Sequence, residues 1–215
     1  MKAVVVAAAP LVRSPLVQRY LHEAELIVAA DGGAANLRTM NVFPHLVVGD
    51  LDSLDARLRG ELEDHGAQFE EHPVRKDKTD LHLALEAAAA RGATQVAILG
   101  AEGGARMDHS AANLLLLALD RFAALDLRLV QGLAEARVIR REAEFQGEPG
   151  HLITLLALTD RVTGIYTEGL EYPLVDGVLL RGDSLGVSNV MTGGRARVRV
   201  GAGVLLAVHQ HGYPE

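Results

Sequence analysis

Short apolar runs alternate with segments of helical spacing over residues 3 to 130 of the chain. Continuous apolar runs rich in β-branched residues lie at 3–8, 25–30, 46–48, 95–99 and 126–130. Strands that are apolar on both faces are typical of buried parallel sheets. Between them, apolar residues recur at helical spacing over 14–24, 34–40, 54–65, 80–91 and 108–121. Because strands and helices alternate, the pattern predicts a doubly wound α/β layer with right-handed crossovers.

After Gly132 the pattern changes to short runs that alternate or contain β-branched residues, separated by Gly, Pro and Asp. These runs lie at 135–140, 152–158, 161–166, 178–181, 195–200 and 203–209. Such spacing favours a small antiparallel sandwich or barrel. We therefore expect an α/β domain over residues 1–135, with an open, mostly parallel sheet and flanking helices. A small antiparallel β-sandwich domain should follow over residues 136–215.

Composition excludes several classes of protein. The chain has 215 residues, 49% of them hydrophobic, enough to bury the core of one large domain or two modest ones. A net charge of -7 disfavours a nucleic-acid-binding role, which calls for a basic face. No apolar run approaches the ~20 residues of a membrane-spanning helix, and the N-terminal run is interpreted as a first buried strand, not a signal peptide. Cys is absent, which rules out disulfides and thiolate metal sites and favours a cytoplasmic location.

Three loops that contain Gly and an acidic residue follow predicted strands, at 31–34 (DGGA), 49–53 (GDLDS) and 100–104 (GAEGG). All three should lie at the carboxyl ends of parallel strands, where open α/β sheets bind ligands. Each loop alone has a structural alternative: a Gly-Gly pair is often a turn, and Asp52 or Ser53 could be a helix N-cap. Their convergence on one edge favours a binding site.

The hexapeptide 75–80 (RKDKTD) contains Lys76 and Lys78, two of the three lysines in the chain, and precedes the strongest predicted helix. In the structural interpretation Asp77 caps that helix and Asp80 complements its dipole. In the functional interpretation the two carboxylates share a hard cation while the lysines hold phosphate oxygens.

The acidic residues match the preference of Mg²⁺ for carboxylates, phosphates and water. The predicted metal-binding and catalytic set is Asp50, Asp52, Asp77 and Asp80. There is no G-x-x-x-x-G-K-[ST] loop, no G-x-G-x-x-G after the first strand and no G-x-S-x-G elbow. These observations favour a Mg²⁺-dependent enzyme that transfers a phosphorus group from a nucleotide.

Taken together, the motifs resemble those of the thiamine pyrophosphokinase family. The resemblance rests on DGGA at 31–34, GDLDS at 49–53, KDKTDL at 76–81, RMDH at 106–109 and VSN at 187–189. It spans nearly the whole chain, in order.

The resemblance implies a nucleotide-binding catalytic α/β domain, a thiamine-binding and dimer-forming sandwich, and a homodimer with sites between its subunits. It implies transfer of the pyrophosphoryl group of Mg·ATP to the hydroxyl of thiamine. Residues expected to contact ATP or its phosphates are Asp31, Gly32, Gly33, Lys76, Lys78, Thr79 and Arg106. Residues expected to contact the acceptor substrate are Asp108, His109, Ser188 and Asn189.

The chain departs from the family pattern in two places. One additional residue separates the glycines from Arg106, and there is no Trp to pack on the thiamine ring, a place that Met191 or Tyr166 could take. Two alternatives stay open: a pyrophosphokinase acting on a hydroxymethyl-pterin, and a non-catalytic regulatory protein that binds ATP.

Overall fold

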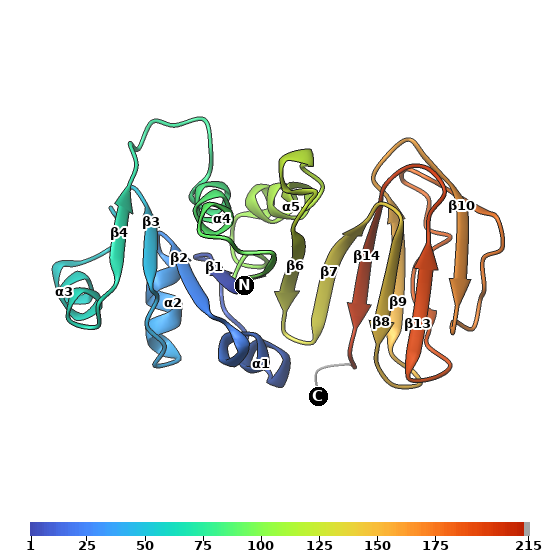
Figure 1. Cartoon of the computed structure of the whole chain (residues 1–215), viewed down its shortest axis with the longest axis horizontal. Coiled ribbons are helices and arrows are strands. Elements are labelled where there is room, and N and C mark those ends of the chain that lie inside the picture. The colour runs from blue at the N-terminus through green and yellow to red at the C-terminus, as the bar shows by residue number, and fades with distance from the viewer. Residues whose placement is uncertain (213–215) are drawn as a thin grey trace. The chain divides into compact units, whose positions relative to one another are not determined.

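In the computed structural model, which describes residues 1–212, the chain forms two units, Met1–Gly132 and Leu133–Glu215 (Figure 1). The sequence-based division was placed after residue 135, and the last three residues of the expected second domain lie outside the described residues.

The first unit contributes six strands to a sheet of ten, and every neighbouring pair among these six is parallel. Its strands, in spatial order, are β6 (Asp126–Gln131), β5 (Gln95–Leu99), β1 (Lys2–Val6), β2 (Leu26–Ala30), β3 (Leu46–Gly49) and β4 (Gln68–Glu71). Strand order runs outward from β1 in both directions, so the sheet has a topological switch point between β1 and β5. The predicted parallel α/β layer is confirmed.

Strand β4 was not predicted from the sequence. Its four residues, QFEE, contain a single apolar side chain and none is fully buried. As an edge strand it pairs only with β3, and edge strands commonly carry charged residues.

Five α-helices and one 3₁₀ helix lie in the first unit. They are α1 (Pro15–Glu23), α2 (Gly33–Thr39), α3 (Ala56–Asp64), α4 (Asp80–Ala90), α5 (Met107–Leu116) and η1 (Asp120–Phe122). Helices α1, α2 and α3 share one hydrophobic cluster with alternate residues of the central strands. Helix α4 packs on β1, β2 and β3. None of the helices within residues 1–212 is long and apolar enough to cross a membrane.

Helix starts overturn two structural alternatives raised by the sequence. Asp77 does not cap α4; the N-cap is Thr79, whose hydroxyl accepts a hydrogen bond from the His82 amide at 3.3 Å. Neither Asp52 nor Ser53 caps α3, because Asp55 does so, accepting from the Leu58 amide at 2.7 Å. The predicted helix over 108–121 ends earlier, at Leu116.

The second unit contains two layers of antiparallel strands. One has the order β12 (Asn189–Val190), β9 (Leu152–Ala157), β14 (Leu205–Gln210) and β7 (Ala134–Ile139). The other has the order β11 (Gly177–Leu180), β10 (Arg161–Glu168), β13 (Arg195–Arg199) and β8 (Glu142–Gln146).

Alternate residues of both layers meet in one core, including Phe145 of β8, Val198 of β13, Ile153 of β9 and Leu205 of β14. The predicted β-sandwich is confirmed. Strands β8 and β12 were not predicted, because β8 (EAEFQ) is mostly polar and β12 has two residues.

Ser14 links the first helix to the end of the sheet. Its hydroxyl accepts a hydrogen bond from the Val17 amide at 3.1 Å, capping α1, and donates to the Gly132 carbonyl at 2.6 Å. We expect Ser14→Ala to lower the free energy of unfolding by about 1–2 kcal/mol, as measured by urea denaturation. Exposed Ser184→Ala is the control and should leave stability unchanged; equal stability of the two variants would contradict the capping role.

Candidate active site

A cleft of about 550 Å³ opens at the carboxyl ends of the strands of the first unit. Loops after β1, β2, β3 and β5, the segment before α4 and the start of α5 all contribute to it. Its polar lining includes Asp31, Asp50, Lys76, Lys78, Thr79, Asp80, Arg106, His109, Ser110 and Asn113. The volume is in the usual range for small-molecule sites.

Three carboxylates gather at this edge. Asp31, Asp50 and Asp52 each offer an oxygen, and the three oxygens lie within 4.8 Å of one another. The register of β2 and β3 explains the meeting of the first two, because Ala30 pairs with Val48 and both acidic residues follow their strands closely. One oxygen of Asp31 is buried without a hydrogen-bond partner among residues 1–212, which leaves a buried acceptor for a cation to satisfy.

The backbone around these carboxylates adopts unusual conformations. Asp31 and Leu51 have φ values of 44° and 61°, in the left-handed region that non-glycine residues seldom occupy. Gly49, with a φ of 156°, lies against two acidic residues: a Cβ there would be 3.0 Å from Asp31 Cβ and 3.2 Å from Asp80 Oδ1. Strain of this kind is concentrated at functional sites, and here it allows the acidic side chains to approach closely.

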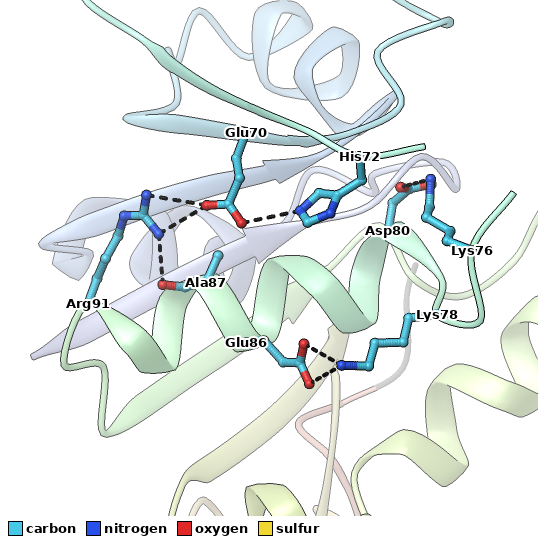
Figure 2. A network of polar contacts seen from close by, with 8 residues as sticks. All are labelled: Glu70, His72, Lys76, Lys78, Asp80, Glu86, Ala87 and Arg91. Carbon is cyan, nitrogen blue, oxygen red and sulfur yellow. Dashed lines mark hydrogen bonds and ion pairs between the residues drawn. The ribbon is translucent and has the colours of Figure 1, made fainter. Parts of the chain in front are cut away.

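Lys76 pairs with two carboxylates. Its Nζ is 3.2 Å from Asp50 Oδ2 and 2.9 Å from Asp80 Oδ1, the contact that Figure 2 shows. Burial alone would lower the pKa of Lys76, but its hydrogen bonds to Asp80 and Asp50 outweigh burial and raise it. The ammonium group therefore stays charged and links β3 to the start of α4.

The pKa values of neighbouring carboxylates shift in opposite directions. Burial raises the pKa of Asp50, yet hydrogen bonds from Lys76 and the Asp52 amide more than offset this and hold it below its usual value. The charge of Asp50, followed by partial burial and the charge of Asp31, raises the pKa of Asp52. The negative charges of Asp31, Asp50 and Asp52 repel one another at this separation. A bound cation would relieve this repulsion. The all-oxygen donor set of the cluster fits a hard divalent cation such as Mg²⁺.

Lys78 points away from this cluster, along α4, to Glu86 (Figure 2). Its Nζ is 2.8 Å from both Glu86 oxygens. Glu86 also pairs with Arg121 at 2.8 Å and with His82 at 3.3 Å. To contact a phosphate, the ammonium of Lys78 must exchange this partner.

The structure separates Asp77 from the other predicted metal ligands. The Asp77 side chain is exposed and is not among the residues that line the cleft, whereas Asp80 lines it. Within residues 1–212, Asp77 is also not one of the acidic residues whose carboxylate oxygens gather with that of Asp50. Its role as a ligand stays a prediction.

Arg106 lines the cleft at the start of α5 and pairs in bidentate fashion with Asp108, at 2.9 and 2.6 Å. This pairing, the leading cause, holds the pKa of Asp108 well below its usual range. Both side chains are about two-thirds exposed, at 67% and 65%, so solvent weakens the ion pair. His109 lines the cleft beside them.

Gly32 and Gly33 do not line the cleft but position the start of α2. A Cβ on Gly33 would lie 1.9 Å from the Val6 carbonyl oxygen, so only glycine lets the helix approach β1 this closely. Their predicted contact with ATP or its phosphates stays a prediction.

Ser188 and Asn189 lie in the second unit, and their polar groups are partly engaged. Ser188 has a φ of 59° and donates its amide to Thr154 Oγ1 at 3.0 Å. The Asn189 side chain accepts from the Tyr172 amide at 3.0 Å and donates to the Tyr172 carbonyl at 2.7 Å. It thus holds in place an aromatic residue that is 65% exposed.

Sequence reasoning missed three features of these sites. The sequence did not predict that Asp31 lies beside Asp50 and Asp52, which its position after a strand next to β3 could have indicated; its predicted contact with ATP or its phosphates stays a prediction. Glu86 pairs with Lys78 and with His82; the spacing of four residues on α4 could have indicated only the pair with His82. Tyr172 carries no sequence signal. Met191, considered for the place of the missing Trp, is 1% exposed and belongs to the sandwich core.

An open parallel sheet with acidic loops and a partly buried lysine at its carboxyl edge is typical of α/β enzymes that transfer phosphorus groups. Residues 17–128 match the family model of the thiamin pyrophosphokinase catalytic domain, and residues 138–205 match that of the thiamin pyrophosphokinase vitamin B1 binding domain. The chain therefore belongs to the thiamine pyrophosphokinase family, and the resemblance predicted from its motifs is confirmed.

Individual relatives agree with this assignment. Thiamine pyrophosphokinase from Bacillus subtilis (strain 168) is 26% identical over 207 residues, which cover 95% of this chain and 96% of the relative. A crystal structure of thiamine pyrophosphokinase from Bacillus subtilis has a TM-score of 0.87 at 24% identity, covering 99% of this chain and 100% of that one. Thiamin pyrophosphokinase from Candida albicans has a TM-score of 0.81 at 15% identity, covering 98% and 89%. These two structural matches show a shared fold.

The coupling between Asp50 and Asp52 can be measured directly. Because the charge of Asp50 is the largest cause of the raised Asp52 pKa, we expect Asp50→Asn to lower the Asp52 pKa toward its ordinary value. Carboxyl ¹³C NMR titration without divalent ions would measure the Asp52 pKa in the wild-type protein and in Asp50→Asn. Exposed Asp64→Asn should leave the Asp52 pKa unchanged, and an Asp52 pKa unaffected by Asp50→Asn would refute the coupling.

Proposed function

We propose that the chain transfers the pyrophosphoryl group of Mg·ATP to the hydroxyl of thiamine, giving thiamine diphosphate and AMP. The observation that carries this proposal is the cluster of Asp31, Asp50 and Asp52 beside Lys76, in a cleft at the carboxyl edge of the sheet. Membership of the thiamine pyrophosphokinase family supports the choice of acceptor.

The residues that would hold Mg²⁺ are Asp31, Asp50 and Asp52. Asp80 lies beside this site, because Lys76 pairs with both Asp50 and Asp80. The unpartnered buried oxygen of Asp31 and the crowding that raises the pKa of Asp52 both support a cation there. When bound, Mg²⁺ would neutralise charge on the triphosphate and orient it. The charged Lys76 would add a second, permanent positive group at the same place.

Positioning and charge neutralisation would do most of the catalysis, because transition states of phosphoryl type are loose. The thiamine hydroxyl would attack the β-phosphorus in line, with AMP as the leaving group. Lys76 and Lys78, together with Arg106, would offset charge on the transferring group. Lys78 and Arg106 are each paired with a carboxylate in this structure, so each can exchange that partner for a phosphate oxygen.

The acceptor is proposed to contact Asp108, His109, Ser188 and Asn189, with Tyr172 as an exposed aromatic surface for its ring. Tyr172 is suited to stacking because Asn189 fixes its backbone while its side chain stays exposed. A cytoplasmic location stays a prediction.

We also propose a homodimer with sites between its subunits. Its support is an exposed apolar stripe on and beyond α5, where Met107, Leu115 and Leu119 recur at multiples of four residues. Met107 is 84% exposed and Leu115 is 62% exposed, which is unusual for residues of this size on a helix that also lines a cleft. A second copy covering this stripe would lie next to Arg106 and His109.

The activity test measures AMP release from Mg·ATP with thiamine as acceptor. We expect wild-type protein to release AMP only when thiamine is present, and Asp52→Asn to lower kcat at least ~100-fold while circular dichroism stays native, because a ligand of the charge-neutralising cation is lost. Asp64→Asn, an exposed carboxylate on α3, is the matched control. Unchanged turnover in Asp52→Asn would show that the carboxylate cluster is not the catalytic centre.

Two further measurements distinguish the proposed function from a pterin-specific pyrophosphokinase and from a regulatory ATP-binding protein. AMP release with a hydroxymethyl-pterin but not with thiamine would assign the acceptor differently, while the carboxylate chemistry would stand. Calorimetric binding of ATP with no acceptor-dependent product would favour a regulatory ATP-binding protein and reject the proposed transfer.

Asp77→Asn, assayed in parallel, tests whether this exposed carboxylate joins the cation site.

For the dimer, Leu115→Glu would place a charge in the middle of the apolar stripe. We expect this variant to sediment as a monomer and wild-type protein as a dimer in analytical ultracentrifugation. Leu180→Glu, a 50% exposed leucine in the second unit, is the control for an added surface charge. A wild-type monomer at micromolar concentration, or an undisturbed Leu115→Glu dimer, would overturn the assignment of this interface.

A further inference from the structure

Three histidines meet at one end of the sandwich because of strand register. In the pairing of β14 with β9, Gln210 lies opposite Leu152. One step further along this ladder places His211 opposite His151. His209 and His211 are two residues apart and therefore lie on the same face of the strand. All three imidazoles are thus directed to one side of the layer.

That side is the interior of the sandwich. Leu205 and Ala207, which share the face of His209 on β14, belong to the hydrophobic core. His209 itself is 2% exposed, and its ring makes an edge contact with Phe145 of the opposite layer at a centroid distance of 5.8 Å. The cluster therefore closes one end of the core, with His151 and His211 partly exposed.

The ring nitrogens are close enough to share one ion. One nitrogen from each of His151, His209 and His211 lies within 4.8 Å of the other two. The rings of His209 and His211 have centroids 3.7 Å apart, and each lies 5.5 Å from that of His151. Nitrogens bound to a common zinc-type ion at about 2.0–2.1 Å stand somewhat closer together than this limit, so small side-chain rotations suffice.

His209 has a polar atom that calls for a partner. Its Nε2 is buried and makes no hydrogen bond within residues 1–212. A buried polar atom without a partner is costly, and a bound cation would remove that cost.

No side chain of Gly147 fills the space beside the ring nitrogens of His151 and His209. Gly147 faces them without a side chain: a Cβ there would lie 2.7 Å from His151 Nδ1, 3.1 Å from His209 Nε2 and 3.0 Å from Met191 Sδ. Nδ1 of His151 accepts only a long hydrogen bond, 3.3 Å, from the Glu148 amide. Buried Glu135, opposite His209 in the β7–β14 pairing, adds negative charge, while Arg137 on the same strand adds positive charge.

We propose that His151, His209 and His211 form a binding site for one divalent transition-metal ion of the zinc class, separate from the carboxylate cluster of the first unit. Imidazole nitrogens suit zinc, cobalt, nickel and copper, whereas Mg²⁺ prefers oxygen. Three protein ligands leave a fourth position for water. The ion would tie the start of β9 to the end of β14 and close the core at this end.

The test titrates Co²⁺ and then Zn²⁺ into full-length protein without an affinity tag, freed of metal by a chelator. Excess Mg²⁺ is present to occupy the carboxylate cluster. We expect one equivalent of Co²⁺ per chain to give visible absorption bands of a low-coordinate nitrogen site, which Zn²⁺ abolishes by displacement. Bound Zn²⁺ should also raise the melting temperature. Absence of saturable binding near one equivalent in the wild-type protein would overturn the proposal by itself.

Variants locate the site. His151→Gln and His211→Gln, at partly exposed positions, should each weaken Co²⁺ binding at least ~10-fold and abolish the Zn²⁺-dependent rise in melting temperature. His22→Gln, an exposed histidine on α1, is the matched control and should bind as wild type does. Asp52→Asn should also keep the site. Binding that survives both cluster variants, or that is lost in Asp52→Asn, would contradict the assignment, whatever the outcome of the pyrophosphoryl-transfer assay.

Discussion

The contact of Lys76 with Asp50 and Asp80 is the interaction on which the arrangement of the first unit's cleft depends. Parallel neighbours β2 and β3 end side by side, so Asp31 and Asp50 are forced together by sheet geometry. Such crowding is unfavourable unless positive charge is present. Lys76 supplies part of it and, in doing so, fixes the segment that leads into α4. The remaining charge deficit is what makes the site suitable for a metal–nucleotide complex.

Much of the fold follows from local pattern. Continuous apolar runs predicted five of the six parallel strands, and helical spacing predicted all five α-helices of the first unit. Strand β4 was not predicted because its sequence, QFEE, has no apolar run; its strand conformation depends on pairing with β3. The end of α5 at Leu116 was not predicted because the apolar pattern continues through Leu117, although the chain there turns toward η1. In both places tertiary contacts decide against the local signal.

The site was predictable to the level of loops but not of side chains. Acidic residues after strands predicted a shared edge, and Asp50 and Asp52 lie there. The same reasoning could not separate Asp77 from Asp80, because it did not locate the N-cap at Thr79, which leaves Asp77 in the preceding segment and places Asp80 at the first helical position. Nor could it assign partners to the lysines: Lys76 pairs with Asp50 and Asp80. Lys78, two residues later, pairs with Glu86 on α4.

The most direct test of the account is to locate the divalent ion. Crystals of the protein grown with Mn²⁺ and a non-hydrolysable ATP analogue would reveal the ion by its anomalous scattering. The account predicts a peak within coordination distance of carboxylate oxygens of Asp31, Asp50 and Asp52, with the triphosphate beside Lys76. A triphosphate bound elsewhere, or an ion in that complex with none of these three residues as a ligand, would contradict it.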